Sequence, residues 1–236
     1  VFTSYQDDSY GGDTNGDGPS EGSAGDWGTI YVSGADGSSF SHCEFKYGGN
    51  EALEINGVNA SISQSRFDTN EGGLLVRDVD LKVRDSTFTG NSKGIIYDNS
   101  ETEVVGSEFK GNKWVYSIED NNGYSTVNPE NCTYSDNEGG KRIYVDGDIE
   151  NGKTRFRDLG LTYVVDHLNI SSGGSLQIAP GVVVKMQRWD SYIDVVGNGQ
   201  IIAEGTSDSP IVFTSYQDDS YGGDTNGDGP SEGSAG

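Results

Sequence analysis

The sequence predicts an all-β solenoid, a parallel β-helix with coils of about 21 residues, and three observations support this fold. First, hydrophobic residues make up only 32% of the 236 residues, while glycine contributes 36, about twice its usual share. Second, the apolar residues occur in short alternating runs such as LEI, LKV and EVV, which suit strands and are too short for helices. Third, aromatic residues recur at a nearly constant interval.

The aromatic interval defines three parallel columns in the sequence. The aromatic column, at intervals of 21 to 25 residues, consists of Phe45, Phe67, Phe88, Phe109, Tyr134 and Phe156. Two residues before each lies a small residue, and this column consists of Cys43, Ser65, Ser86, Ser107, Cys132 and Thr154. Three residues after four of the aromatics lies an asparagine, namely Asn70, Asn91, Asn112 and Asn137. The first coil has its asparagine displaced to Asn50, and the last coil has Leu159 instead.

Columns of this kind predict coils that stack at the spacing of β-strands, about 4.8 Å. We expect the aromatic and small residues to form ladders inside the solenoid. We expect the asparagines to lie at a turn, because asparagine tolerates left-handed backbone and its amide can bond to the next asparagine along the stack. An antiparallel sandwich is the alternative, but strands spaced by 8–12 residues would not keep a 21-residue column in register.

The columns also predict the state of the two cysteines. Cys43 and Cys132 lie in one column, four coils apart. This is roughly 19 Å, well beyond the ~7 Å Cα limit for a disulfide, so we expect two free, buried thiols. Two cysteines in a secreted protein would otherwise suggest one bridge, and an intrachain bridge would disprove this register.

The first 25 residues, VFTSYQDDSYGGDTNGDGPSEGSAG, are identical to residues 212–236. The sequence is therefore a single β-helix domain over 1–236, with a period of 211 residues and the start of the next repeat at 212–236. Three interpretations remain open. The chain is a window on a tandem array, or a subunit whose two ends play equivalent roles in an end-to-end assembly, or the duplication has no biological role.

The charge excludes several classes of function. Acidic residues outnumber basic ones 38 to 15, which gives a net charge of −23 and an isoelectric point of about 4.1. An acidic chain without a basic cluster repels phosphate, so we expect no nucleic-acid partner. No stretch approaches the roughly 18 apolar residues of a membrane helix, so we expect no membrane span.

The duplicated segment contains a candidate cation site. Residues 13–18 read DTNGDG, the first half of a calcium loop, with side-chain oxygens at positions 1, 3 and 5 and glycine at position 6. Position 12 is Ala24 instead of glutamate, so this is not a complete EF-hand and flanking helices are not expected. Hard oxygen ligands favour calcium over transition metals, and their irregular spacing disfavours magnesium. The candidate ligands are Asp7, Asp8, Asp13, Asn15, Asp17, Glu21 and Asp26, with Asp218, Asp219, Asp224, Asn226, Asp228 and Glu232 in the copy. The alternative is a solvated acidic loop that keeps the surface soluble.

The second half of the chain resembles a known family. Residues 176–185 read LQIAPGVVVK, residues 196–206 read VGNGQIIAEGT, and residues 210–215 read PIVFTS, a pattern that DWGTI at residues 26–30 fits as a continuation. These segments and the aromatic column resemble right-handed parallel β-helix, pectate-lyase-like repeat proteins of bacterial and archaeal cell surfaces. The resemblance implies a right-handed coil and an extracellular or cell-surface location. It implies little about activity, because this architecture serves lyases, adhesins, sheath proteins and phage tailspikes.

Other candidate sites are weaker. One lyase-like patch would combine Arg66, Arg77, Lys82 and Arg84 with Asp78, Asp80 and Asp85. Outward charges on strands usually form a solvated face, so we do not expect an enzyme. His42 and Cys43 are adjacent on a strand, so they point to opposite faces and cannot act as a nucleophile and base. Possible glycan-stacking aromatics are Trp114, Tyr116, Tyr124 and Trp189, and glycosylation sequons begin at Asn59, Asn131 and Asn169.

The function expected from these features is structural. A β-helix has unpaired strand edges at both ends, and neither end of this sequence contains an amphipathic helix or a polar cap. We expect units that stack end to end on copies of themselves into a filament, stalk or sheath. Calcium would fold the acidic loop and neutralise charge, since each 211-residue period carries a net charge of −18. A glycan-binding adhesin on the cell surface is the alternative, and a polysaccharide lyase or hydrolase is a third, less favoured one.

Overall fold

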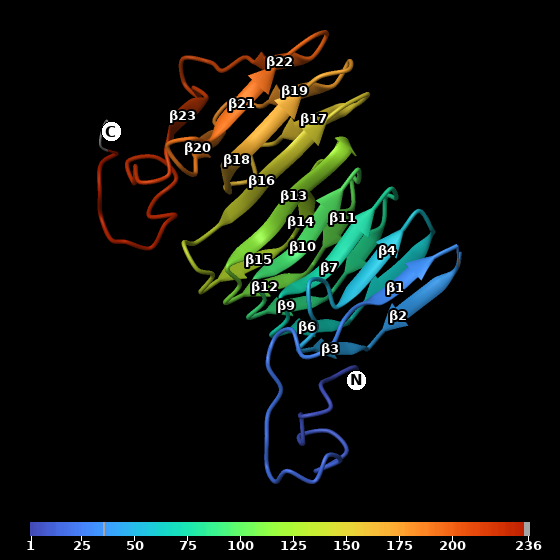
Figure 1. The fold of residues 1–236 in the computed structure, drawn as a ribbon. Coiled ribbons are helices and arrows are strands. Elements are labelled where there is room, and N and C mark those ends of the chain that lie inside the picture. The colour runs from blue at the N-terminus through green and yellow to red at the C-terminus, as the bar shows by residue number, and fades with distance from the viewer. Residues whose placement is uncertain (35, 234–236) are drawn as a thin grey trace.

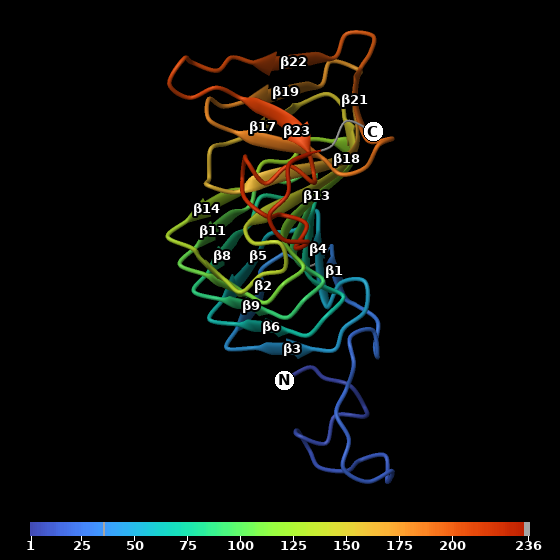
Figure 2. The same ribbon diagram turned by 90° about the vertical axis from the view of Figure 1, so that its left-hand side faces the viewer.

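The structure, a computed structural model, describes residues 1–34 and 36–233, which form 23 β-strands and no helix. The strands stack in parallel along one axis, from the N-terminal coil in blue to the C-terminal coil in red (Figure 1). Seen from the side, the chain winds around the axis as a solenoid (Figure 2). The predicted parallel β-helix is therefore confirmed.

Four sheets make up the solenoid. The main sheet contains, in order, β1 (Ile30–Ser33), β4 (Leu53–Asn56), β7 (Gly72–Arg77), β10 (Lys93–Asp98), β13 (Trp114–Gly123), β16 (Arg142–Ile149), β18 (Thr162–Ile170), β20 (Val183–Met186) and β23 (Val212–Ser215), with β21 (Tyr192–Val195) also paired to β18. The second sheet contains β2 (Ser38–Ser41), β5 (Ala60–Ser63), β8 (Lys82–Arg84), β11 (Glu103–Val105) and β14 (Asn128–Glu130). The phenylalanine sheet contains β3 (Glu44–Lys46), β6 (Arg66–Asp68), β9 (Thr87–Thr89), β12 (Glu108–Lys110) and β15 (Thr133–Ser135). The terminal sheet contains β17 (Lys153–Phe156), β19 (Ser175–Ile178) and β22 (Gln200–Ala203).

The core consists of residue columns that run along the axis. In the main sheet, seven fully buried side chains lie in register from coil to coil: Leu53, Leu74, Ile95, Tyr116, Ile143, Tyr163 and Val184. In the phenylalanine sheet, the rings of Phe45, Phe67, Phe88 and Phe109 stack with centroids 4.7–4.9 Å apart. Each coil therefore buries the same apolar positions on top of those of its neighbour.

The aromatic column ends at Tyr134, one coil earlier than the predicted end at Phe156. Tyr134 still stacks on Phe109, at 5.7 Å. Phe156 instead lies in β17 opposite Ile178, and its ring stacks on Tyr163 at 4.1 Å. Thr154 likewise does not follow Cys132 but accepts a hydrogen bond from the backbone of Ser125. The prediction was wrong here because the coil that begins at β16 has no strand in the phenylalanine sheet. Its second strand, β17, pairs with β19 in the terminal sheet, and residues 157–161, which lead from β17 to β18, form no strand.

The asparagine ladder forms as predicted, in the order Asn70, Asn91, Asn112 and Asn137. Each Nδ2 donates to the Oδ1 of the next asparagine at 2.9–3.1 Å. Two details differ from the prediction. The first position is occupied by Gly48, whose N–H donates to Asn70 Oδ1, and not by Asn50. The left-handed backbone belongs to the residue before each ladder residue, such as Tyr47, Thr69 and Gly90.

The cysteines are free, as the column alignment predicted. Both are half-buried and not fully buried. The neighbouring small residues form a ladder of their own, in which the backbone N–H of Ser65 and of Ser86 donates to the hydroxyl of the next serine at 3.2 Å. The described part of the chain includes no helix long and apolar enough to cross a membrane.

Candidate functional site

The duplicated segment folds in the same way at both ends of the solenoid. In the first copy, Gly18 N–H donates to Asp13 at 3.1 Å, and Ser20 N–H donates to Asp8 at 2.8 Å. In the second copy, the equivalent bonds to Asp224 and Asp219 have the same lengths. Glycines with φ of about 75–90° make the tight turns that place these amides around the carboxylates. The loop conformation is therefore set by the segment itself and not by its surroundings.

Each loop gathers three carboxylates around one point. One oxygen each from Asp8, Asp13 and Asp17 lies within 4.8 Å of the others, and the copy has the same group in Asp219, Asp224 and Asp228. The segment contains no lysine or arginine to balance them. Asp8 Oδ1 is buried without a hydrogen-bond partner, and so is its counterpart, Asp219 Oδ1. A hard divalent cation fits this donor set, because calcium is bound by carboxylate oxygens and would satisfy the orphaned atom.

The remaining predicted ligands lie elsewhere. Asp7 is buried and accepts hydrogen bonds from Thr3 and Ser9, as its copy Asp218 does from Thr214 and Ser220. Asp26 accepts from Ser4 and from the backbone of Ser23. Glu21 and Glu232 are exposed and lie outside the groups of three. Asn15 and its copy Asn226 each accept from the backbone two residues later, within the DTNGDG turn.

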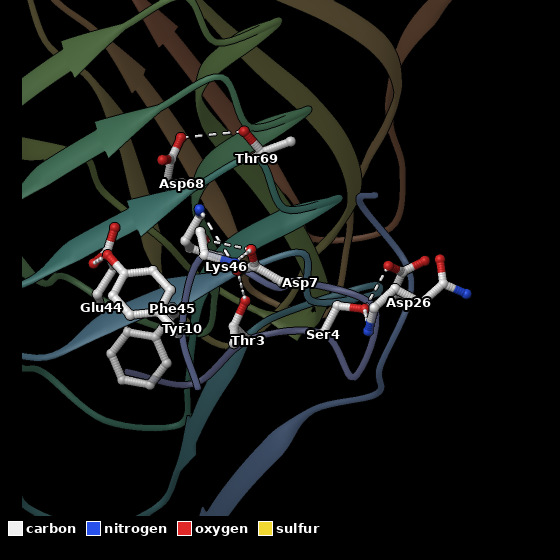
Figure 3. Close-up of polar contacts among 12 residues, drawn as sticks. Thr3, Ser4, Asp7, Tyr10, Asp26, Glu44, Phe45, Lys46, Asp68 and Thr69 are labelled. Carbon is white, nitrogen blue, oxygen red and sulfur yellow. Dashed lines mark hydrogen bonds and ion pairs between the residues drawn. The ribbon is translucent and has the colours of Figure 1, made fainter. Parts of the chain in front are cut away.

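The first copy packs against the first coil of the solenoid (Figure 3). Phe2 forms a parallel bridge with Phe45 and stacks on its ring at 5.0 Å. Asp7 lies 3.7 Å from the ammonium of Lys46, and Tyr10 donates to Glu44 at 2.7 Å. Burial acts to raise the pKa of Asp7, but hydrogen bonds from Ser9 and Thr3, together with Lys46, outweigh it and lower the pKa. This carboxylate therefore stays ionised in the docked segment.

The second copy packs against the last coils through different residues. Its strand, β23, pairs with β20. The buried Lys185 donates to Gly223 O and Thr225 Oγ1, both at 2.8 Å. The buried Arg142 guanidinium lies 4.0 Å from the ring of Trp114 and donates to Tyr216 Oη and Thr225 O. Burial lowers the pKa of both basic groups, so each needs the oxygens that the loop supplies.

Arg142 and Lys185 hold the second copy of the segment, and the sequence analysis did not select them. Basic residues are usually solvated, Arg142 belongs to no motif, and the segment LQIAPGVVVK that ends at Lys185 indicates a fold and not a contact. The one available signal is position, since Lys185 ends the apolar run VVVK and Arg142 begins the strand RIYV.

The lyase-like patch does not assemble. Arg66 lies in the phenylalanine sheet, Arg77 in the main sheet, and Lys82 and Arg84 in the second sheet. Arg66, Arg77 and Lys82 each pair with nearby carboxylates. Asp78 and Asp85 lie at left-handed corners between strands, and Asp80 accepts a backbone hydrogen bond from the neighbouring coil.

The aromatic and sequon candidates divide by exposure. Trp114 and Tyr116 are buried, so they cannot stack on a glycan, whereas Tyr124 and Trp189 are exposed. Asn59 and Asn131 are exposed, and Asn169 is half-buried within β18. The structure also gathers Asp146, Asp166 and His167 on the main sheet, a group that no sequence pattern indicated. Arg188 already neutralises part of it through Asp166.

Comparison with known protein families agrees with this architecture. A family model described as a pectate-lyase-like β-helix domain matches residues 149–227. A second, described as a right-handed β-helix region, matches residues 22–154. Neither the curated proteins nor the solved structures include a match. Because the right-handed β-helix region spans more than half of the sequence and coincides with the stacked three-strand coils, the chain belongs to the right-handed parallel β-helix family.

Proposed function

We propose that the chain is a structural repeat protein whose β-helical units follow one another end to end in an extracellular filament, stalk or sheath. One observation carries this proposal: the same 25-residue segment packs on the first coil through one set of residues and on the last coil through another. A segment that can bind both ends of a solenoid is suited to join two of them. The extracellular location is supported by the acidic, Gly/Asn/Ser-rich composition and by the resemblance to surface proteins.

The proposal defines an axial repeat. From β1 to β23 the main sheet rises by eight strand spacings, and the step from Phe2 to Phe45 adds one. Nine spacings of about 4.8 Å correspond to about 43 Å per unit.

Calcium would act at the joints. Asp8, Asp13 and Asp17 would hold it, with the orphaned Asp8 Oδ1 as one donor. When bound, the ion would supply positive charge where units with a net charge of −18 meet. The expected effect is a rise in the stability of the loop and of the joint.

The test uses a two-period protein, in which residues 1–211 precede the whole chain. Electron microscopy and small-angle X-ray scattering should show one straight rod, about 43 Å longer than the single-period chain. Two short bodies at variable angles would refute the end-to-end function. Repeating the measurement with calcium and with a chelator separates the two parts of the proposal. A rod that is equally straight and equally stable in the chelator would remove calcium from it.

A further inference from the structure

We infer that the duplicated segment is a shared edge strand: β23 keeps its pairing with β20 while its outer edge pairs with β3 of the following copy. The inference rests on the proposed end-to-end function and specifies the surface and the partner. The partner strand is Glu44–Lys46 of a second copy of this chain.

The backbone of the segment has one free edge at each end of the solenoid. In the second copy, the N–H groups of Val212 and Tyr216 donate to the carbonyls of Val182, just before β20, and Met186, at its end, at 3.0 and 2.9 Å. Alternate residues of a strand direct their backbone N–H and C=O groups to opposite edges. The N–H and C=O of Phe213 therefore point toward the outer edge, away from β20. In the first copy, the equivalent residue is Phe2, and its N–H and carbonyl bond to Glu44 and Lys46, at 2.7 and 2.9 Å. The bridge of Phe2 in the first copy and the pairing of Val212–Ser215 in the second copy therefore use opposite edges of the segment.

The side chain of Phe213 supports the same joint. It lies in register with the buried Val184, so it continues the main core column. Its open side faces a hollow of about 740 Å³ lined in part by Met186 and Trp189, and the ring remains 48% exposed. At the other end, the equivalent Phe2 covers Phe45 and is 40% exposed. In a joint where the Phe213 ring lies between Val184 and Phe45 of the next copy, both faces of that ring would be covered.

The acidic loop also has two separate faces. The preceding coils contact the loop at Tyr216, Gly222, Gly223 and Thr225. The corresponding residues of the first copy are free of the solenoid: Tyr5 is 70% exposed, and Thr14 is exposed although Thr225 is 1% exposed.

The following coil contacts the loop through the other face. In the first copy its contacts are Phe2, Asp7 and Tyr10, and the counterparts of the two aromatics in the second copy, Phe213 and Tyr221, are both nearly half-exposed. Phe213 would lie between the two neighbours, and no other residue named here belongs to both contact sets, so one loop can hold both neighbours at once.

This joint has a defined geometry. The main sheet of one unit would continue through β20 and β23 into β3, β6 and β9 of the next, which belong to the phenylalanine sheet. Each unit would therefore be turned about the axis by one face of the coil relative to the unit before it.

The experiment must free β3, because in the single chain Phe2 already occupies it. The double substitution Phe2→Asp and Asp7→Lys places a charge in the stack and a like charge beside Lys46, and should detach the first copy. We expect the variant to form head-to-tail oligomers whose size increases with concentration in analytical ultracentrifugation. Adding Phe213→Asp should return it to a monomer, and the unsubstituted chain should remain monomeric. A double variant that stays monomeric, although proteolysis shows the first copy detached, would overturn the inference.

Disulfide trapping tests the register. All proteins carry Cys43→Ser and Cys132→Ser. A chain with Val212→Cys is mixed with the detached double variant carrying Glu44→Cys, and we expect a cross-linked dimer. Arg66→Cys in place of Glu44→Cys is the matched control, because Arg66 lies opposite Glu44 one strand further away, at about 10 Å from the donor. Equal trapping at both positions would refute the pairing.

Hydrogen exchange in the two-period protein provides a measurement without substitutions. The Phe213 amide should be protected at the inner joint and exchange rapidly in the terminal copy. If both copies exchange alike while the protein is a single straight rod, the shared strand is wrong and the end-to-end function stands. If the rod itself is absent, the function fails first.

Discussion

Replacing Asn91 tests whether the asparagine ladder stabilises the solenoid. Asn91 is 1% exposed and lies in the middle of the ladder. Its Oδ1 accepts from the backbone N–H and the side-chain amide of Asn70, at 3.0 and 2.9 Å. Its Nδ2 donates to Phe67 O and to Asn112 Oδ1, both at 3.0 Å. The substitution Asn91→Ala therefore removes four hydrogen bonds in a region closed to water.

The expected loss follows from the groups left without partners. The backbone N–H of Asn70 and one of its amide hydrogens lose their partners, and Phe67 O loses one hydrogen bond, whereas Asn112 Oδ1 keeps the bond from the Asn91 backbone. A buried unsatisfied polar group costs about 1–3 kcal/mol, and relaxation recovers part of this. We expect Asn91→Ala to lower the free energy of unfolding by about 3–5 kcal/mol, a large part of the ~5–15 kcal/mol of an ordinary domain.

The variant Asn91→Asp adds a dependence on pH. An ionised carboxylate would face two acceptors, Phe67 O and Asn112 Oδ1, so the folded state should raise its pKa. The protonated form can still donate one hydrogen bond. The loss of stability should therefore grow as the pH rises from about 4 to 7, because the unfolded state releases the proton first.

The assay is urea denaturation followed by circular dichroism, with Asn59→Ala as the control. Asn59 is exposed and its side chain bonds only weakly to Asp36, at 3.4 Å, so its loss should change stability by less than about 0.5 kcal/mol. If Asn91→Ala costs less than about 1 kcal/mol, the ladder is not a source of stability and the reasoning is refuted.

Three further predictions follow from the structure. Burial raises the pKa of Asp120 to about 6, so the folded state holds a proton that the unfolded state has lost; stability should fall by up to about 3 kcal/mol as the pH rises from 4 to 6, and Asp120→Asn should remove this fall in thermal melts. Phe88→Ala, with rings stacked on both faces, should lower the free energy of unfolding by about 3–5 kcal/mol, and Phe2→Ala, stacked on one face, should cost clearly less; equal losses would contradict the ladder. The double substitution Asp13→Asn and Asp224→Asn should abolish any rise in melting temperature caused by calcium. Glu21→Gln should leave that rise unchanged, since Glu21 lies outside the cluster of three carboxylates.

The sequence by itself determined the coil. Side chains repeated at a nearly constant interval of 21 residues can only share a face if the chain returns to the same point once per repeat. Phe67 and Phe88 therefore stack, and Asn70 and Asn91 bond, as the columns indicated. The same argument kept Cys43 and Cys132 apart.

Only the tertiary structure decided which groups meet across the ends. Asp7 and Asp8 are neighbours in the sequence, yet one lies beside Lys46 and the other joins Asp13 and Asp17. The backbone of the loop directs these two carboxylates to different partners, and no periodicity in the sequence specifies those directions. The burial of Arg142 beneath Thr225, 83 residues later, was equally hidden. Such contacts depend on how the duplicated segment packs on the end coil of the solenoid. Local sequence patterns specify which face of a strand a residue occupies, but not which distant segment packs against that face.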